Sequence, residues 1–372
     1  MGEPQFMIEL HANAVCELDN GNAEAKISVP TPIVLMNTNN LVETARAILA
    51  PGKGLLAADE SFPSIEKRFK SIGIPSTEEN RLAYREMLFT TPDLGKFISG
   101  VILFDETLRQ KIGGVPIPEV LAQRGMIPGI KVDLGAVALP NFDGEKFTQG
   151  LDGLRERLAE YYKLGARFTK WRAVISIGDG IPSRGCIEVN AQALALFAAL
   201  SQEAGLVPIV EPEVLMDGAH SIARCEDTIH LTLKSVFDAL VVNRVILEQM
   251  ILKSGMVLSG SECPDQAKLN DIAWSTLSVF RRTVPAAVPG IVFLSGGQSD
   301  ELATERLNAV CKLGNAPWTI TFSYGRALQA PALAAWKGLK AQVEAGQNAL
   351  YKRAELNSLA ALGQYTTEME KV

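Results

Sequence analysis

The sequence lacks a long run of apolar residues and lacks an excess of basic residues. No stretch of the 372-residue chain reaches the length of about 20 apolar residues that a membrane-spanning helix needs. Its 36 Lys and Arg are outnumbered by 42 Asp and Glu, which gives a net charge of −6. An acidic chain exerts no general attraction on nucleic acid or on anionic membranes. We therefore expect neither a nucleic acid nor a membrane as a partner.

Patterns of metal ligands and disulfides are also missing. The chain has three histidines and five cysteines, and none of them lies in an HxxxH or CxxC pattern. This argues against a zinc site built on histidine, so we expect no metal. The cysteines are single and odd in number, which favours reduced thiols inside a cell over a disulfide framework.

The N-terminal stretch carries no recognisable targeting pattern. It lacks the basic-then-apolar order of a signal peptide, and its Glu and Asp content argues against a transit peptide. We interpret residues 1–40 as a leader whose order the sequence does not indicate. The cytoplasm is the expected location, with an organelle as the alternative.

Eight short runs rich in Val, Ile, Leu and Phe recur along the chain, with helix-like segments between them. The predicted strands cover residues 54–61, 98–106, 127–135, 166–176, 206–215, 249–257, 290–298 and 318–326. Strand and helix alternating in this way are typical of a closed parallel barrel. An open doubly wound sheet is the alternative, but no GxGxxG follows the first run. We therefore predict an α/β fold, a (β/α)₈ TIM barrel, as a single domain over residues 41–362 with a C-terminal tail at 363–372.

Two details of the helices are also predicted. The Ser-x-x-Glu sequence that begins at Ser76 resembles a capping box at the start of a helix. The residues from Leu328 onward indicate one long helix followed by a short end.

Charged residues interrupt five of the eight predicted strands, where buried parallel strands should be apolar. Residues two apart share a face of a strand, and barrel enzymes place their chemistry at the C-terminal ends of strands. A structural layer of ion pairs is the alternative to a catalytic cleft. A lysine among other cations and carboxylates is typical of an amine nucleophile. The residues are Asp59 and Glu60, Lys131 and Asp133, Lys170 and Arg172, Glu211 and Glu213, and Lys253.

Glycine-bearing loops follow the last two predicted strands, in the segments LSGGQ and SYGRALQ. Loops at these two places, each leading into a helix, are the common phosphate site of such barrels. Ordinary strand-to-helix turns are the alternative. A lysine nucleophile and a phosphate pocket together predict a reaction in which the lysine forms a Schiff base with a phosphorylated carbonyl compound. The candidate phosphate-binding residues are Ser295, Gly296, Gly297, Ser323, Gly325 and Arg326.

The motifs of the chain resemble those of class I fructose-bisphosphate aldolases. The match runs in order over about residues 45–362, through APGKGLLAADES, GVILFDETL, GIKVD, TQGLDGL, KWR, VPIVEPE, RRTVP, FLSGGQS and TFSYGRALQA. The resemblance implies reversible cleavage of fructose 1,6-bisphosphate to dihydroxyacetone phosphate and glyceraldehyde 3-phosphate, with no metal or organic cofactor. The alternatives are another ketose phosphate, such as sedoheptulose 1,7-bisphosphate or fructose 1-phosphate, and a scaffolding or actin-binding role on the same fold.

The resemblance also implies a role for each matching residue. Lys253 corresponds to the Schiff-base lysine, Glu211 to the acid and base of carbinolamine formation and dehydration, and Asp59 to the base of bond cleavage. Lys170 would hold Lys253 unprotonated by charge repulsion and help to stabilise developing negative charge, and Glu213 would orient the lysines. Ser295, Gly296 and Arg326 match residues that bind the phosphate near the ketone. Polar positions along the other arm of the cleft are matched by Ser61, Ser64, Lys67, Arg68, Lys131 and Arg172.

The chain departs from the usual motifs at several places. Ser254-Gly255 follows Lys253 where Pro-Asn is usual, and Phe62-Pro63 stands where Thr-Gly is common. The chain stops at Val372 without the terminal tyrosine of many animal-type members. The resemblance implies that the missing terminal tyrosine bears on the rate of the later proton step and on the preference between bisphosphate and monophosphate substrates. The resemblance further implies a homotetramer and a cytoskeletal partner.

Overall fold

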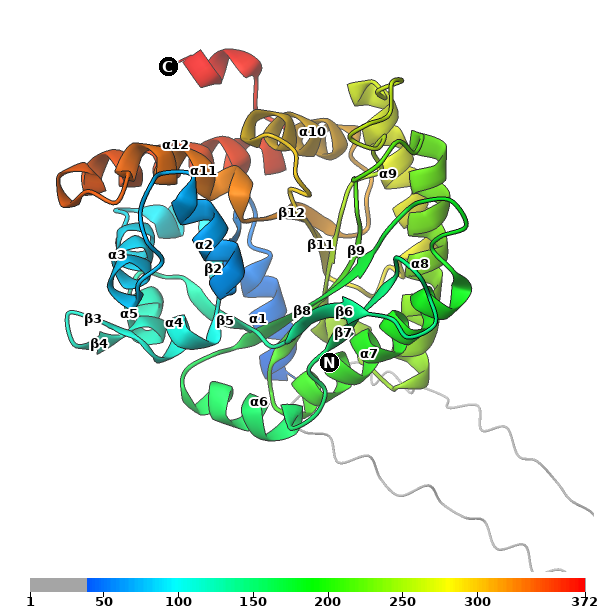
Figure 1. Cartoon of the computed structure of the whole chain (residues 1–372), viewed down its shortest axis with the longest axis horizontal. Helices are drawn as coiled ribbons and strands as arrows, with labels where there is room; N and C mark the ends of the chain where they lie inside the picture. Colours follow the sequence, from blue (N-terminus) through cyan, green and yellow to red (C-terminus); the bar gives the residue numbers. More distant parts are fainter. Residues whose placement is uncertain (1–38, 372) are drawn as a thin grey trace, which may run out of the picture. The chain divides into compact units, whose positions relative to one another are not determined.

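Residues 39–371 are described by the computed structural model, in which eight parallel strands close into a barrel (Figure 1). The order around the barrel is β1-β12-β11-β10-β9-β8-β5-β2. Each strand lies inside one of the eight predicted runs, so the prediction of a (β/α)₈ barrel is confirmed. The bounds are β1 (Gly54–Ala58), β2 (Ile98–Leu103), β5 (Ile127–Lys131), β8 (Phe168–Ile175), β9 (Val207–Val214), β10 (Ile251–Ser254), β11 (Gly290–Phe293) and β12 (Thr319–Tyr324).

Helices surround the barrel, and two small hairpins extend from it (Figure 1). The helices are α2 (Phe62–Lys70), α3 (Glu78–Phe89), α4 (Asp105–Arg109), α5 (Ile117–Gln123), α6 (Leu154–Lys163), α7 (Arg184–Glu203), α8 (Ile222–Val242), α9 (Leu269–Thr283), α10 (Asp300–Leu313), α11 (Arg326–Trp336) and α12 (Val343–Ala361). The hairpins pair β3 (Lys111–Ile112) with β4 (Val115–Pro116), and β6 (Gly135–Ala138) with β7 (Lys146–Gln149). Within the described part of the chain, no helix is long and apolar enough to cross a membrane.

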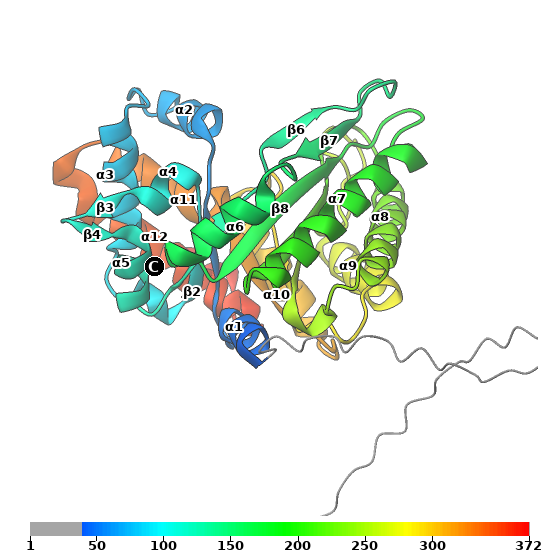
Figure 2. The ribbon, with the colours of Figure 1, turned by 90° about the horizontal axis from the view of Figure 1, so that it is seen from below.

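Helix α1 (Asn39–Ile48), which the sequence analysis did not predict, closes one end of the barrel. Its buried side chains Leu41, Ala45 and Ile48 form one cluster with inward-facing residues of the strands, among them Phe168 and Ile209. Figure 2 shows α1 at the end of the barrel opposite to α2 and the β6–β7 hairpin. Helix α2 and strand β6 follow the C-terminal ends of β1 and β5, so these strand ends lie at the end of the barrel away from α1. The chemistry is expected at that end.

Two local predictions are wrong. Helix α3 is capped by Thr77, whose Oγ1 accepts a hydrogen bond from the backbone N–H of Asn80 at 3.3 Å, so Ser76 is not its N-cap. The C-terminal region is not one long helix, because α11 ends at Trp336 and is followed by Lys337 and Gly338, whose left-handed backbone (φ 53° and 75°) cannot continue a helix. The first 38 residues of the predicted leader lie outside the described part of the chain.

Candidate active site

The register of three neighbouring strands brings the predicted charged residues to one place. Ile209 of β9 and Ile251 of β10 are paired, and both face the barrel interior. Glu211 and Lys253 lie two residues further along these strands, so they face the interior as well. Lys170 of β8 pairs with Ile209 and therefore has the same orientation. Three charged side chains thus converge at the open end of the barrel.

Two lysines share one carboxylate at this point. Lys253 Nζ lies 3.1 Å from Glu211 Oε1, and Lys170 Nζ lies 3.3 Å from Glu211 Oε2. Lys170 Nζ also lies 2.7 Å from Asp59 Oδ2, just past the end of β1. Lys170, Glu211 and Lys253 are buried, so these charges act on each other with little screening by water. The result is a chain of alternating charges that runs Lys253, Glu211, Lys170, Asp59.

The protonation states of two of these groups follow from their surroundings. Burial alone raises the pKa of Asp59, but the positive charges of Lys170 and Lys253 outweigh it and hold this pKa well below its usual range. Burial alone lowers the pKa of Lys170, but the carboxylates of Asp59 and Glu211 outweigh it and hold this pKa above its usual range. Asp59 is therefore ionised and Lys170 is a lasting positive charge beside Lys253.

Two further charged pairs stand next to this chain of charges, and the first includes a residue beyond the end of its strand. Strand β5 ends at Lys131, so Asp133 lies beyond the strand, where its Oδ1 accepts from Lys131 Nζ at 2.7 Å. Glu213 pairs with the guanidinium of Arg172, and its expected role in orienting the lysines stays a prediction. The register places Arg172 opposite Glu211, two residues beyond Lys170, so Arg172 lies nearer than Lys170 to Glu213.

All but one of the predicted site residues line a single cleft of about 650 Å³. Gly297 is the exception. The predicted residues in the cleft are Asp59, Ser61, Ser64, Lys67, Arg68, Lys131, Lys170, Arg172, Glu211, Glu213, Lys253, Ser295, Gly296, Ser323, Gly325 and Arg326.

The cleft also contains Ser71, which the sequence analysis did not name, and Glu60 and Asp133, which it named among the charged strand residues without giving them a role. Ser71 had a recognisable signal, since it follows Lys67 by four positions and Arg68 by three on the same face of α2. Glu60 is buried against two guanidinium groups, and Gln329 Nε2 donates to it at 2.9 Å. No sequence spacing connects Glu60 with these partners.

The loops after β11 and β12 meet at Arg326. A Cβ placed on Gly297 would lie 3.6 Å from Arg326 NH2, so this guanidinium lies against the glycine loop although Gly297 does not line the cleft. Gly296 and Gly297 both have positive φ (55° and 91°), which favours glycine and leaves the loop backbone open to a ligand. The buried Ser323 Oγ has no hydrogen-bond partner within residues 39–371. A buried hydroxyl without a partner beside an arginine fits an anion site.

The loops that follow β9 and β10 are joined to each other by backbone hydrogen bonds. The N–H groups of Gly260, Ser261 and Glu262 donate to the carbonyls of His220, Met216 and Gly218, at 2.8, 2.7 and 2.9 Å. A Cβ on Gly260 would lie 2.2 Å from the Gly218 carbonyl oxygen, so only glycine allows this approach. These bonds hold together the two strands that carry Glu211 and Lys253.

Comparison with known proteins identifies the family. The sequence model described as "Fructose-bisphosphate aldolase class-I" matches residues 40–372. The chain belongs to the class I fructose-bisphosphate aldolase family. This aldolase is 56% identical over 332 residues to the "Probable fructose-bisphosphate aldolase class 1" of Xanthomonas campestris, covering 89% of this chain and 99% of the relative. It is 51% identical over 337 residues to "Fructose-bisphosphate aldolase 1" of Toxoplasma gondii, covering 90% and 93%.

A solved structure agrees with the fold. Fructose-bisphosphate aldolase from Plasmodium falciparum, solved in complex with TRAP and a small-molecule inhibitor, superposes on this aldolase with a TM-score of 0.87. The two are 51% identical, and the match covers 88% of this chain and 95% of that one. The resemblance read from the motifs is confirmed. This aldolase is a glycolytic carbon–carbon lyase that acts on fructose 1,6-bisphosphate.

Proposed function

We propose that Lys253 is the nucleophile of this aldolase and that Glu211 moves the protons of the first step. The amine of Lys253 attacks the ketone carbon of the sugar and forms a carbinolamine. Glu211, 3.1 Å from Lys253 Nζ, takes up the proton of the amine and returns one to the departing hydroxyl, so that water leaves and an iminium remains. The observation that carries the proposal is the buried chain Lys253, Glu211, Lys170, Asp59.

Asp59 and Lys170 serve the bond cleavage in this proposal. Asp59 takes the proton of the hydroxyl on the far side of the breaking carbon–carbon bond, and the electron pair of that bond flows into the iminium to give an enamine. An aldehyde leaves. Lys170, whose Nζ lies 2.7 Å from Asp59 Oδ2 and 3.3 Å from Glu211 Oε2, would stabilise the negative charge that develops during this step. Protonation and hydrolysis of the enamine release dihydroxyacetone phosphate and restore Lys253.

The phosphates are assigned to the two sides of the cleft. Ser295, Gly296, Ser323, Gly325 and Arg326 would bind the phosphate near the ketone, with Gly297 shaping the loop. The unpartnered hydroxyl of Ser323 and the position of Arg326 against the glycine loop support this assignment. The second phosphate would be bound by Ser61, Ser64, Lys67, Arg68, Lys131 and Arg172. Glu213 and Asp133 would hold Arg172 and Lys131 in place.

Trapping the covalent intermediate tests the proposal. Sodium borohydride added with dihydroxyacetone phosphate should reduce the iminium, inactivate the protein and add mass to the peptide that contains Lys253. Borohydride alone, as the control, should do neither. EDTA should leave turnover intact, because no step uses a metal. Absence of the adduct on the Lys253 peptide, as read by mass spectrometry, would overturn the mechanism.

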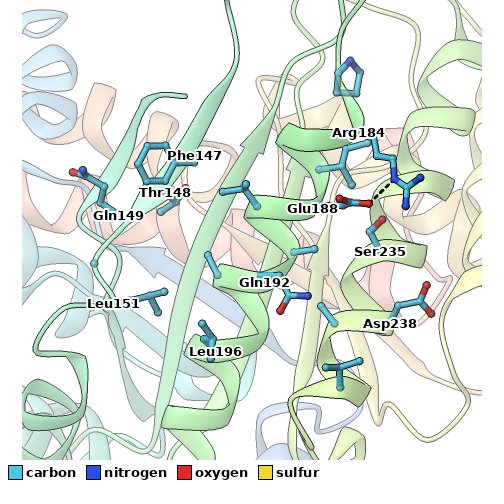
Figure 3. A pocket seen from close by; sticks show the side chains of 18 of the residues that line it. Phe147, Thr148, Gln149, Leu151, Arg184, Glu188, Gln192, Leu196, Ser235 and Asp238 are labelled. Carbon is cyan, nitrogen blue, oxygen red and sulfur yellow. Dashed lines mark hydrogen bonds and ion pairs between the residues drawn. The ribbon is translucent and has the colours of Figure 1, made fainter. Parts of the chain in front are cut away.

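We also propose that the chain assembles as a homotetramer and that a groove on its outer surface forms one of the contacts between copies. The groove has a volume of about 1290 Å³ and lies between α7, α8 and the β6–β7 hairpin (Figure 3). Leu231 and Val242, which line it, are 51% and 75% exposed. Four of its charged residues form the pairs Arg184–Glu188, drawn in Figure 3, and Lys234–Asp238, which leaves only the negative charge of Asp152. A largely apolar face with little net charge suits the same face of a second copy.

Placing a charge in this groove is expected to break the assembly. In Leu231→Asp, a carboxylate would be buried without a partner at the contact, so sedimentation should show a species smaller than the wild-type tetramer. Leu339→Asp, which changes an exposed leucine outside the groove, is the control and should leave the tetramer intact. A wild-type protein that sediments as a monomer would overturn the assembly, and a tetrameric Leu231→Asp protein would overturn the choice of surface.

The remaining assignments concern the rest of the chain and its surroundings. We propose a leader at residues 1–40, the barrel domain at 41–362 and a short tail at 363–372, with the cytoplasm as the location. The described cysteines Cys186, Cys225, Cys263 and Cys311 are free thiols, which supports an intracellular protein. A cytoskeletal partner is also proposed. The Plasmodium falciparum aldolase, solved with TRAP bound, supports the capacity of this fold to bind another protein.

A further inference from the structure

Helix α2 forms one wall of the cleft. Ser64, Lys67, Arg68 and Ser71 line the cleft at the spacing i, i+3, i+4 and i+7, so they share one face of the helix or its C-terminal extension. The opposite face is buried in the core through Ile65 and Phe69. The placement of a single helix therefore sets the position of four polar side chains relative to the barrel.

The N-terminus of α2 is not held by an ordinary cap. Ser61 is its N-cap residue, but the Ser61 side chain makes no hydrogen bond to the helix backbone. Ser61 Oγ lies instead 3.2 Å from Ser64 Oγ, and both residues line the cleft. The hydroxyl that would usually fix the start of the helix is thus available to a ligand, and the start of the helix must be held in another way.

Phe62, the first residue of α2, makes the contacts that hold it. Its ring packs edge-on against Phe104, with centroids 5.3 Å apart and planes at 83°, at the end of β2. The guanidinium of Arg81, from α3, lies 4.8 Å from the centroid of the same ring. Phe62 is nonetheless 47% exposed, so it is held by these two partners and not by the core.

Both partners of Phe62 are themselves fixed. Arg81 donates from Nε and NH2 to the carboxylate of Glu106 at 2.8 and 2.5 Å, and from NH1 to the carbonyl of Ser76. Phe104 is the N-cap residue of α4, the helix that contains Glu106. The Phe62 ring therefore joins α2 to a rigid unit made of α3 and α4, outside the cleft and without contact with the reacting atoms.

We propose that Phe62 is a positioning residue that fixes α2 through Phe104 and Arg81 and thereby determines the preference of the cleft for a sugar with a second phosphate. The inference rests on the proposed function, in which α2 binds that second phosphate. Loss of the ring contacts leaves α2 anchored by Ile65 and Phe69 but free to tilt at its N-terminal end. Ser61, Ser64 and Lys67 then reach the second phosphate less often, while Lys253 and the loops after β11 and β12 are unaffected.

The test compares two substrates in Phe62→Leu, which keeps an apolar side chain but loses the ring. The kcat/KM for fructose 1,6-bisphosphate should fall about threefold to tenfold, as expected for an aromatic pair with a cation over the ring. This loss of kcat/KM should come from a higher KM, with kcat nearly unchanged. The kcat/KM for fructose 1-phosphate, which has no second phosphate, should change by less than about twofold. Phe104→Leu should give the same shift, and the double variant should add little to either single change.

The control is Trp274→Leu, which removes an exposed aromatic ring from α9, away from the cleft. It should leave the ratio of the two kcat/KM values unchanged. A lower Tm for Phe62→Leu with an unchanged ratio would show a purely structural residue and would overturn the inference. An equal loss on both substrates would overturn it too, by placing the effect at Asp59 or Lys253. Failure of the proposed function is seen separately, as a missing borohydride adduct in the wild-type protein.

Discussion

Replacing Lys253 by methionine is expected to lower kcat for fructose 1,6-bisphosphate on the order of 10⁴-fold or more, because methionine cannot form the iminium. The fold should survive the change. Methionine is similar in length and uncharged, and Glu211 keeps Lys170 as a partner at 3.3 Å. Removal of one partner of a buried ion pair is destabilising, but Glu211 stays paired with Lys170, so Tm should fall less than in Glu211→Gln, which leaves Lys253 without its carboxylate. Steady-state kinetics and thermal unfolding measure the two effects.

The same substitution at Lys170 is the matched control. Lys170→Met removes the partner that lies 2.7 Å from Asp59 and should slow turnover. It leaves the nucleophile in place, so borohydride with dihydroxyacetone phosphate should still label the Lys253 peptide. Labelling of Lys170 in the Lys253→Met protein would contradict the assignment, because it would show that either buried amine can attack the ketone.

Glu211→Gln is expected to impair both chemistry and stability. Glutamine can neither take up nor deliver the protons of carbinolamine formation and dehydration, so kcat should fall about 10²- to 10⁴-fold. The change also removes the negative charge that lies between Lys170 and Lys253. Removal of one partner of a buried ion pair leaves a charge uncompensated, so the free energy of unfolding should fall by roughly 3 kcal/mol. Turnover and urea unfolding at neutral pH test the two effects.

Glu203→Gln separates the effect of burial from the effect of charge. Glu203 is at the end of α7 and pairs with Arg155 at 2.6 Å on the surface, where both side chains are exposed. An exposed pair contributes at most about 1 kcal/mol, so this variant should keep its stability nearly unchanged and its turnover intact. If Glu211→Gln turned over substrate as fast as the wild type, the protons would have to move through a different group.

The barrel strands could be predicted because burial on both faces leaves a plain sequence pattern. Strand β9 is buried at each position, so it reads as an apolar run broken only by the two glutamates of the site. The β6–β7 hairpin gives no such pattern, because β6 is largely exposed and its pairing depends on β7. Helix α1 carries Leu41, Ala45 and Ile48 at helical spacing, but spacing alone cannot indicate that the helix closes a barrel.

The residues that lie in the site could be predicted better than the ion pairs that they form with each other. Alternation along each strand is a local property, and it placed Lys170, Glu211 and Lys253 on the inner face. The partner of each charge depends on the register between strands, which the sequence does not contain. Glu213 therefore pairs with Arg172 and not with a lysine. Contacts such as those of Phe62 with Phe104 and Arg81 join residues from three separate helical regions, and they appear only once the barrel has closed.

The backbone bonds between the loops after β9 and β10 have a consequence for the engineering of new aldolases. Three donors in one loop are satisfied only by carbonyls of the other, and Gly260 fits only while Gly218 keeps its position. A graft that exchanges one loop alone would leave these donors without acceptors next to the nucleophile. The two loops therefore behave as one structural unit. A design that aims to change the substrate range should exchange both loops together or keep both.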